Sequence, residues 1–160
     1  GWFESEPQMA WGFYGHRLHL YRRTVPHAGF QLLLEWGKAA PSGYFVFTSN
    51  VDGQFQRAGF DEERVAECHG SLHHLQCLHP WRCKPDLIAS AADADPHVDD
   101  VFQCDAATIP QCPAKCGSIA RPNVLLFNDG GWISDRTDEQ ESRLAKWLDE
   151  LDRERKRLVV

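Results

Sequence analysis

The sequence predicts an α/β fold in which a parallel sheet is covered by helices and a small cysteine-rich module is inserted. Short apolar runs at 44–48, 65–66 and 123–127 are each followed by a polar segment. This pattern is typical of strands buried in a parallel sheet with helical cover. The pattern stops between residues 72 and 118, where five of the six cysteines and several prolines occur. We therefore expect one α/β domain interrupted by a module with little core of its own.

The composition is that of a globular protein with an acidic charge balance. The 160 residues include 17 Lys+Arg and 23 Asp+Glu, which gives a formal net charge of −6, and 42% of them are hydrophobic. A protein that wraps nucleic acid needs a basic face, so we expect no direct nucleic-acid binding. No apolar run approaches the roughly 20 residues of a membrane-spanning helix. We therefore expect no membrane insertion and a cytoplasmic protein.

Two helices are predicted before the first strand. Residues 6–23 carry aromatic and leucine side chains at three- and four-residue steps, with Pro7 in a suitable first turn. Pro26 opens the second helix, which ends before the turn at 41–43. The apolar face of this second helix is formed by Phe30, Leu33 and Leu34.

A third helix follows the last predicted strand. Thr137 and Gln140 have the spacing of a capping box, in which the Thr137 side chain caps the first turn and Gln140 reaches back to it. Residues 157–160 then resemble the start of a further strand. The predicted helix has one apolar face, formed by Leu144, Trp147, Leu148 and Leu151.

Polar residues follow the first two predicted strands. Asn50 and Asp52 come after the run 44–48, and His69 comes after the run 65–66. Ligands of open α/β sheets bind beyond the carboxyl ends of the strands. A histidine there can act as a general base, and Asp and Asn can orient a polar ligand. The alternative is turn formation, because Asn-x-Asp-Gly is also a good turn sequence.

Four cysteines have the spacing of a metal site. Cys77 and Cys83 form one pair, Cys112 and Cys116 form a second, and 28 residues separate the pairs. Two thiolate pairs supply the closed tetrahedral set of a structural zinc site, which would stabilise a module with little core. Unliganded thiols are the alternative. Substitute ligands are Cys104 in place of Cys83, or one of the histidines His73, His74 and His79.

Five motifs, taken in order, resemble the sirtuin (Sir2) family. They are Thr48-Ser49-Asn50-Val51-Asp52-Gly53, Gln56-Arg57-Ala58-Gly59, Glu67-Cys68-His69-Gly70-Ser71, the two cysteine pairs, and Arg121-Pro122-Asn123-Val124-Leu125-Leu126-Phe127. The match covers residues 26–130. The wide cysteine spacings and the acidic loop 89–100 resemble a divergent bacterial branch of the family.

This resemblance implies an NAD-dependent protein lysine deacylase. Its expected fold is a Rossmann-like parallel sheet with helices on both faces and an inserted zinc-binding module. The NAD-binding domain would comprise residues 1–71 and 119–160, and the zinc module residues 72–118. The implied cofactors are NAD and Zn²⁺, and the implied partner is an acylated-lysine protein or peptide.

The resemblance also implies roles for single residues. His69 matches the catalytic base and, with Asn50, contacts the cofactor ribose. Asp52 matches the residue that holds the nicotinamide carboxamide, and Gln54 lies in the same cofactor-binding segment. The segment that binds the acyl-lysine peptide matches Val124, Leu125, Leu126, Phe127 and Asn128. The zinc ligands match Cys77, Cys83, Cys112 and Cys116.

Three positions depart from the family pattern. Ser49 replaces the usual Gln, Asn128 the usual Gly, and Asp129 the usual Glu. ADP-ribosyl transfer to protein, or NAD hydrolysis, is therefore an alternative activity of the same site. The family's Gly-Ala-Gly phosphate loop also has no counterpart, so we expect residues 1–160 to be a central portion that does not bind NAD alone. A non-catalytic, zinc-stabilised fragment is the remaining alternative.

Overall fold

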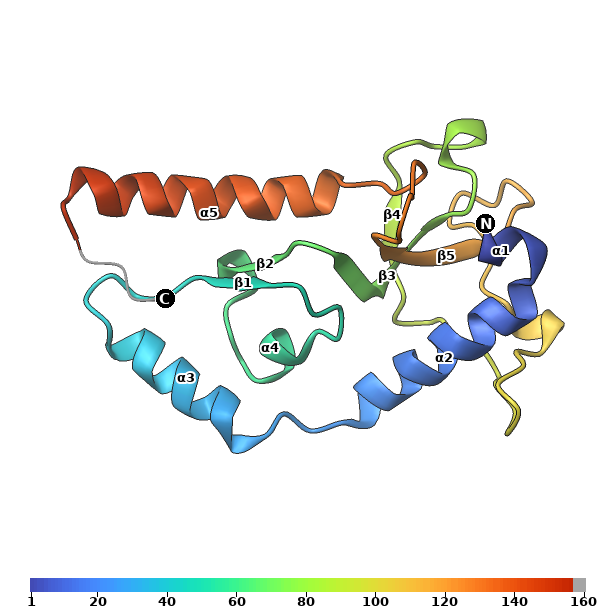
Figure 1. Cartoon of the computed structure of the whole chain (residues 1–160), viewed down its shortest axis with the longest axis horizontal. Coiled ribbons are helices and arrows are strands. Elements are labelled where there is room, and N and C mark those ends of the chain that lie inside the picture. Colours follow the sequence, from blue (N-terminus) through green and yellow to red (C-terminus); the bar gives the residue numbers. More distant parts are fainter. Residues whose placement is uncertain (157–160) are drawn as a thin grey trace.

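The structure, a computed structural model, describes residues 1–156 (Figure 1). Helix α5 runs along one long side of the molecule, α2 and α3 line the opposite side, and two small sheets lie between them. The strand start predicted at 157–160 lies outside the described residues. Among the residues that are described, no helix is both long enough and apolar enough to span a membrane.

Within residues 1–156, three helices precede the first strand, and the five strands then lie between α3 and α5 along the chain. The helices are α1 (Trp2–Ser5), α2 (Pro7–Arg23), α3 (Ala28–Ala39), α4 (Gln54–Arg57) and α5 (Asp135–Arg153). The strands are β1 (Val46–Thr48), β2 (Val65–Glu67), β3 (Gly70–Cys77), β4 (Ile88–Ser90) and β5 (Ala120–Val124). Short 3-10 turns occupy Glu62–Arg64, Pro80–Arg82 and Ala106–Thr108.

Strands β1 and β2 form the predicted parallel pair. Val46 lies opposite Val65, and Thr48 lies opposite Glu67. The α/β class with a parallel sheet is thereby confirmed. The predicted burial of β1 on both faces is wrong, since the Phe47 side chain is 60% exposed. Over residues 1–156, β1 also pairs on one side only, with β2.

A second sheet of three antiparallel strands, in the order β4-β3-β5, was missed in the sequence. The predicted strand over 123–127 ends at Val124 and begins earlier, at Ala120. The chain leaves the strand because the Asp129 carboxylate accepts hydrogen bonds from the N–H groups of Leu126 (3.4 Å) and Gly131 (3.1 Å). This sheet joins segments on both sides of the expected boundaries at 71/72 and 118/119, so the domain division stays a prediction.

The two N-terminal helices agree with the prediction in position. Helix α2 spans Pro7–Arg23, as expected, whereas α3 begins at Ala28 rather than at Pro26. The later start arises because the His27 side chain caps the helix by accepting a hydrogen bond from the Gly29 N–H. The predicted apolar face is narrower than expected, since Leu34 is buried and Leu33 is 51% exposed.

The capping box predicted at the start of α5 is wrong. The helix begins at Asp135, so Thr137 and Gln140 lie inside it. Their side chains instead contact the backbone of Glu67 in β2. The Thr137 hydroxyl donates to the Glu67 carbonyl (3.2 Å), and Gln140 Oε1 accepts from the Glu67 N–H (3.1 Å). These contacts fasten α5 to the parallel sheet.

Helix α2 packs against the cysteine-rich part of the chain. Trp11 is fully buried, and its indole N–H donates to the Ala120 carbonyl at 2.9 Å. Gly12 allows the closest approach, because a methyl group added there would lie 1.8 Å from the Phe102 carbonyl oxygen. The module therefore has a core, contrary to expectation, and that core is shared with α2.

Candidate functional site

The ends of β1 and β2 bring the predicted polar residues to one edge of the parallel sheet. The ladder continues past the strands, since the Cys68 N–H donates to the Thr48 carbonyl (3.0 Å) and the Leu72 N–H to the Val51 carbonyl (2.9 Å). The segments that carry Asn50 and His69 therefore run side by side. Both of these side chains are exposed and free to contact a ligand.

Asp52 occupies a tight turn as well as the predicted site. One of its carboxylate oxygens accepts from the Gln54 N–H (3.0 Å) and closes a turn just before α4. Its carbonyl lies 2.9 Å from His73 Nε2, and Gly53 packs beneath the same ring with φ +66°. The turn interpretation is therefore correct for Asp52. It leaves the second carboxylate oxygen for a ligand.

Gln54 is placed differently from the other candidate cofactor-binding residues. Its side chain is buried, and its amide donates to the Tyr21 carbonyl at the end of α2 (3.0 Å). Its Oε1 has no hydrogen-bond partner among the described residues. Gln54 therefore fastens α4 to α2, and a ligand could reach only this one buried oxygen.

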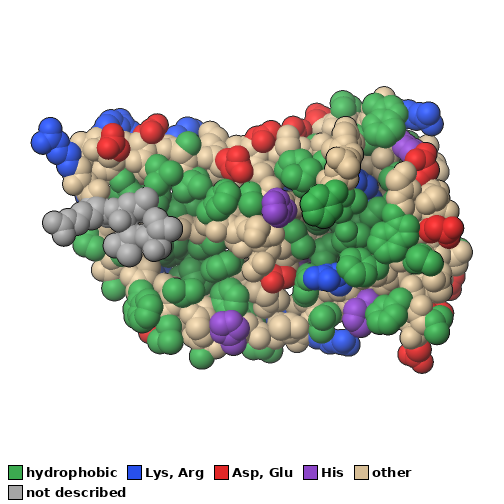
Figure 2. Space-filling view, in the orientation of Figure 1, with side chains coloured by type: hydrophobic (Ala, Val, Ile, Leu, Met, Phe, Trp, Pro, Cys, Tyr) green, Lys and Arg blue, Asp and Glu red, His purple; other side chains and the backbone are tan. Residues whose placement is uncertain are grey.

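The candidate substrate segment, residues 124–128, lies directly against His69. The Leu125 N–H donates to the His69 carbonyl at 3.1 Å, and Val124 pairs with Gly70. Gly70 has φ +76°, and a methyl group there would lie 2.1 Å from the Asn123 carbonyl oxygen, so this contact requires glycine. Figure 2 shows hydrophobic side chains gathered at the end of the molecule that holds β3, β4 and β5. From the substrate segment, Phe127 is fully exposed.

The four predicted cysteines form one cluster. Their sulfur atoms all lie within 4.8 Å of one another, with Cys77–Cys116 at 3.7 Å and Cys83–Cys112 at 3.6 Å. A tetrahedral zinc site with Zn–S bonds of about 2.3 Å has sulfur–sulfur edges of about 3.8 Å. The arrangement therefore fits a zinc ion far better than disulfides, whose sulfur atoms lie about 2 Å apart.

The substitute zinc ligands lie elsewhere. The Cys104 sulfur contacts the Asp105 carbonyl (3.5 Å) and the Thr108 hydroxyl (3.7 Å). His73 is held by Asp52, and His79 Nε2 lies 3.8 Å from a Glu4 carboxylate oxygen.

A pocket of about 200 Å³ opens beside the Asp52 turn, between α4, β3 and the start of α5. His74 lines it, and its ring is largely buried. Burial, followed by the positive charge of Arg136 and the neighbouring His73, lowers the pKa of His74 to about 4. The pocket is lined by Tyr21, Asp52, Gly53, Gln56, Arg57, Glu62, Ser71, His73, His74 and Arg136.

Comparison with known proteins agrees with this geometry. The profile of the Sir2 family matches residues 2–147. The chain belongs to the Sir2 family. It is 31% identical over 157 residues to a "Probable bifunctional ADP-ribose hydrolase/ADP-ribosyltransferase" from Fusarium oxysporum f. sp. cubense, covering 94% of this chain and 25% of that protein.

Other relatives of this Sir2 chain carry deacetylase names. It is 32% identical over 117 residues to NAD-dependent protein deacetylase 1 of Geobacillus kaustophilus, covering 73% of this chain and 40% of that protein. Among solved structures, a Sir2 homologue in complex with NAD is 26% identical, with a TM-score of 0.60, over 79% of this chain and 43% of the other. The chain thus spans less than half the length of these relatives, and its fold is the Rossmann-like fold of the family.

One buried ion pair of the Sir2 chain was missed in the sequence. Glu67 is 1% exposed and pairs with Arg136 at the start of α5. A glutamate in a short apolar strand could have indicated it, because a buried carboxylate needs a partner. The partner itself is 69 residues away, and no local pattern identifies it. With Thr137 and Gln140, this pair fixes the strand that leads to His69.

Proposed function

We propose that the full-length protein is a cytoplasmic, NAD-dependent protein lysine deacylase of the Sir2 type, which releases nicotinamide and O-acyl-ADP-ribose. One observation carries the proposal. His69 lies between the turn that bears Asn50 and Asp52 and the segment 124–128, which donates to the His69 carbonyl. A base, polar cofactor contacts and a peptide-binding segment thus meet at one edge of the sheet.

NAD, when bound, supplies an electrophilic ribose carbon and nicotinamide as leaving group. His69 acts as a general base, since an imidazole nitrogen can take a proton from a ribose hydroxyl. The Asn50 amide orients the ribose by hydrogen bonds. The free carboxylate oxygen of Asp52 accepts a hydrogen bond from the nicotinamide carboxamide. The partner is an acylated-lysine protein or peptide.

The acylated peptide binds by strand addition. β5 is an edge strand of the described sheet, and residues 125–128 extend from its end, with Leu125, Phe127 and Asn128 exposed. An extended peptide can pair with such an edge through backbone hydrogen bonds, while its acyl-lysine reaches the reacting centre. The binding residues proposed here are Val124, Leu125, Leu126, Phe127 and Asn128.

Cys77, Cys83, Cys112 and Cys116 hold a structural zinc ion. The sulfur–sulfur distances support this assignment. Four thiolates close the coordination sphere, so the ion stabilises the module and takes no part in the reaction. A reducing cytoplasm keeps these thiols available for metal.

The proposal is tested by nicotinamide release. The full-length protein is incubated with NAD and an acetyl-lysine peptide, and the His69→Ala variant is compared with His97→Ala, which removes an exposed histidine far along the chain. We expect His69→Ala to lose activity by a factor of about 10² or more, the usual contribution of a general base, and His97→Ala to retain it. Equal activity in both variants would exclude His69 as the base.

ADP-ribosyl transfer is the second candidate function. It is favoured by the name of the Fusarium relative, which matches 94% of this chain, and by Ser49 and Asn128 at positions near the reacting centre. NAD labelled in the adenine ring separates the two activities. Label retained on protein after denaturation indicates transfer, whereas label in O-acyl-ADP-ribose indicates deacylation.

A further inference from the structure

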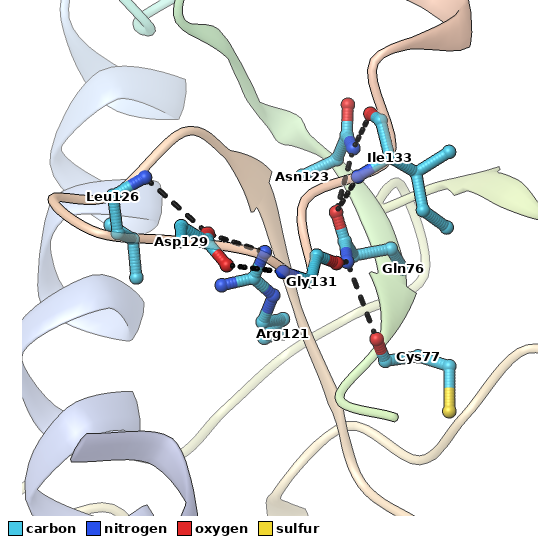
Figure 3. A network of polar contacts seen from close by, with 8 residues as sticks. All are labelled: Gln76, Cys77, Arg121, Asn123, Leu126, Asp129, Gly131 and Ile133. Atoms are coloured by element: carbon cyan, nitrogen blue, oxygen red, sulfur yellow. Dashed lines mark hydrogen bonds and ion pairs between the residues drawn. The ribbon is translucent and has the colours of Figure 1, made fainter. Parts of the chain in front are cut away.

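A buried polar network joins the strands of the cysteine module to the loop that carries the candidate substrate segment (Figure 3). Gln76 and Asn123 are both fully buried. Gln76 Oε1 accepts from the Asn123 side-chain amide (2.9 Å) and from the Ile133 N–H (3.1 Å). Gln76 Nε2 donates to the Gly131 carbonyl at 2.6 Å. One side chain of β3 thus binds β5 and the far end of the loop together.

Asn123 and Arg121 add contacts of their own from β5. The Asn123 amide also donates to the Ile133 carbonyl at 2.8 Å. Arg121 forms an ion pair with Asp129 at 2.7 Å, and both side chains are buried. Asp129 in turn receives the N–H groups of Leu126 and Gly131. The loop 125–133 is therefore held at its middle and at its far end by side chains of β3 and β5.

Apolar packing holds this loop at two points only, since Leu126 packs against the core and Ile133 is buried. Phe127 is fully exposed, Leu125 is 38% exposed, and Asn128 adopts φ +57°. Strand pairing ends at Val124, and beyond it the Leu125 N–H reaches only the His69 carbonyl. The geometry of residues 125–128 relative to His69 thus depends on the polar network together with the packing of Leu126.

We propose that Gln76 is a positioning residue for peptide binding: through Asn123, Gly131 and Ile133 it fixes the loop 125–133 against His69. The inference rests on the proposed function, since it names what sets the affinity for the acylated peptide. Gln76 touches neither the peptide segment nor His69. It acts by satisfying three buried polar groups of the loop and of β5, which are the Asn123 amide, the Ile133 N–H and the Gly131 carbonyl.

The strand that carries Gln76 leads directly into the metal site. Cys77 is the next residue, and Ala120, at the start of β5, pairs with it. Both sides of the network therefore extend from strands anchored at the cysteine cluster. A metal-bound module would present Gln76 and Asn123 at a fixed separation to the loop.

The test compares three variants that remove graded parts of the network. Gln76→Met keeps the side-chain length and removes every hydrogen bond. Asn123→Ala removes two bonds and leaves those of Gln76 to the loop. Gln111→Met is the control, because Gln111 lies in the same module and donates only to the nearby Ile109 carbonyl (2.8 Å). Zinc content and circular dichroism report whether each variant is folded.

Two readouts are taken on the full-length protein. In steady-state kinetics, Gln76→Met should raise the KM for the acetyl-lysine peptide about tenfold, with kcat and the KM for NAD within about twofold of the wild type. Asn123→Ala should raise the KM for the peptide about threefold, and Gln111→Met should leave this KM unchanged. A purely structural loss would instead lower kcat and raise both KM values together, which would overturn the proposal.

The second readout does not depend on activity. Backbone amide exchange of residues 125–133 should be about tenfold faster in Gln76→Met, whereas exchange in α2 and β3 should match the wild type. If the wild type has no deacylase activity, the proposed function fails, and this exchange still decides the inference. If the amide exchange of residues 125–133 in Gln76→Met equals that of the wild type, the positioning role of Gln76 is wrong. If Gln76→Met does not fold, the same comparison is made with Asn123→Ala.

Discussion

The two sheets use polar side chains in opposite ways. At the edge of the parallel pair β1–β2, Asn50 and His69 are exposed and available to a ligand. In the antiparallel sheet β4-β3-β5, Gln76, Arg121 and Asn123 are buried and bound to the protein itself. Under the proposed function, the first sheet carries the reacting groups, and the second positions the loop that binds the substrate.

This difference follows from the partners available to each residue. A buried polar group without a hydrogen bond costs about 1–3 kcal/mol, so the groups of the second sheet are held firmly. Exposed groups at strand ends lose little by remaining free, because water satisfies them. Burial therefore distinguishes polar residues that hold the structure from polar residues that can contact a ligand, even where both are of the same amino-acid type.

The largest effect is expected when one of the proposed zinc ligands is replaced. Cys112→Ser should abolish zinc binding and unfold the antiparallel sheet while α5 and β2 keep their contacts. Binding of structural zinc is worth about 10–16 kcal/mol in small domains, which exceeds the whole stability of many domains. Zinc content by mass spectrometry and amide exchange of β3 and β5 measure the effect.

Cys104→Ser is the matched control for that variant. Cys104 is buried and lies in the same module, but its sulfur contacts Asp105 and Thr108 rather than the cluster. This variant should retain one zinc ion per chain and a protected β3. If both cysteine variants keep zinc, the four-thiolate assignment is wrong.

The second test breaks the ion pair that fastens the parallel sheet to α5. Arg136→Met leaves the fully buried Glu67 carboxylate without its cation, and the free energy of unfolding should fall by about 3–5 kcal/mol. Arg143→Met removes a similar contact on the same helix, where Glu63 is 72% exposed, and should cost less than about 1 kcal/mol. Urea unfolding measures both. Similar costs for the two variants would contradict the burial argument.

The sequence predicted the parts of this fold that depend on local patterns. The position of α2, the parallel strands and the clustering of the four cysteines were predicted from local patterns, and the structure confirms each of them. Strand β3 was missed because residues 72–74 bulge out of the pairing with β5, between Ser71 and Leu75. The bulge destroys the period-two alternation by which a strand is identified.

Partners that are distant in sequence explain the remaining errors. Thr137 and Gln140 have the spacing of a capping box, yet both side chains bond to Glu67, which lies 70 or more residues earlier. In the sequence, Gln76 resembles an ordinary surface polar residue. Its hydrogen bonds to Gly131 and Ile133 are visible only in the structure. Prediction from local sequence patterns places such residues at the surface, because their partners are brought near only by the tertiary fold.

The third test concerns the contact of α2 with the module. Gly12→Ala would place a methyl group 1.8 Å from the Phe102 carbonyl oxygen, so the loop 96–103 must move. Overpacking of this kind costs about 1–3 kcal/mol, which outweighs the gain of up to about 1 kcal/mol in helix propensity. Thermal unfolding measures it. Gly130→Ala is the control, since no atom lies within 4 Å of the added methyl group.

The last test lies where the two regions meet, at His74 of β3 and Arg136 of α5. Burial, with the charges of Arg136 and His73, lowers the pKa of His74 from 6.5 to about 4. The unfolded chain therefore takes up a proton below pH 6.5, while the folded protein does so only near pH 4. The stability from neutral His74 is complete above pH 6.5 and is lost as the pH falls toward 4.

Between pH 7 and pH 5 this linkage should cost the wild type about 2 kcal/mol. His74→Gln cannot take up the proton, so its stability should fall by about that much less over the same range. Taking the difference between variant and wild type cancels protonation of the cysteines, which both proteins share. His97→Gln controls for the loss of an exposed histidine. Equal pH slopes for His74→Gln and the wild type would show that His74 is not held neutral, and that the contact between the two regions leaves this ring open to solvent.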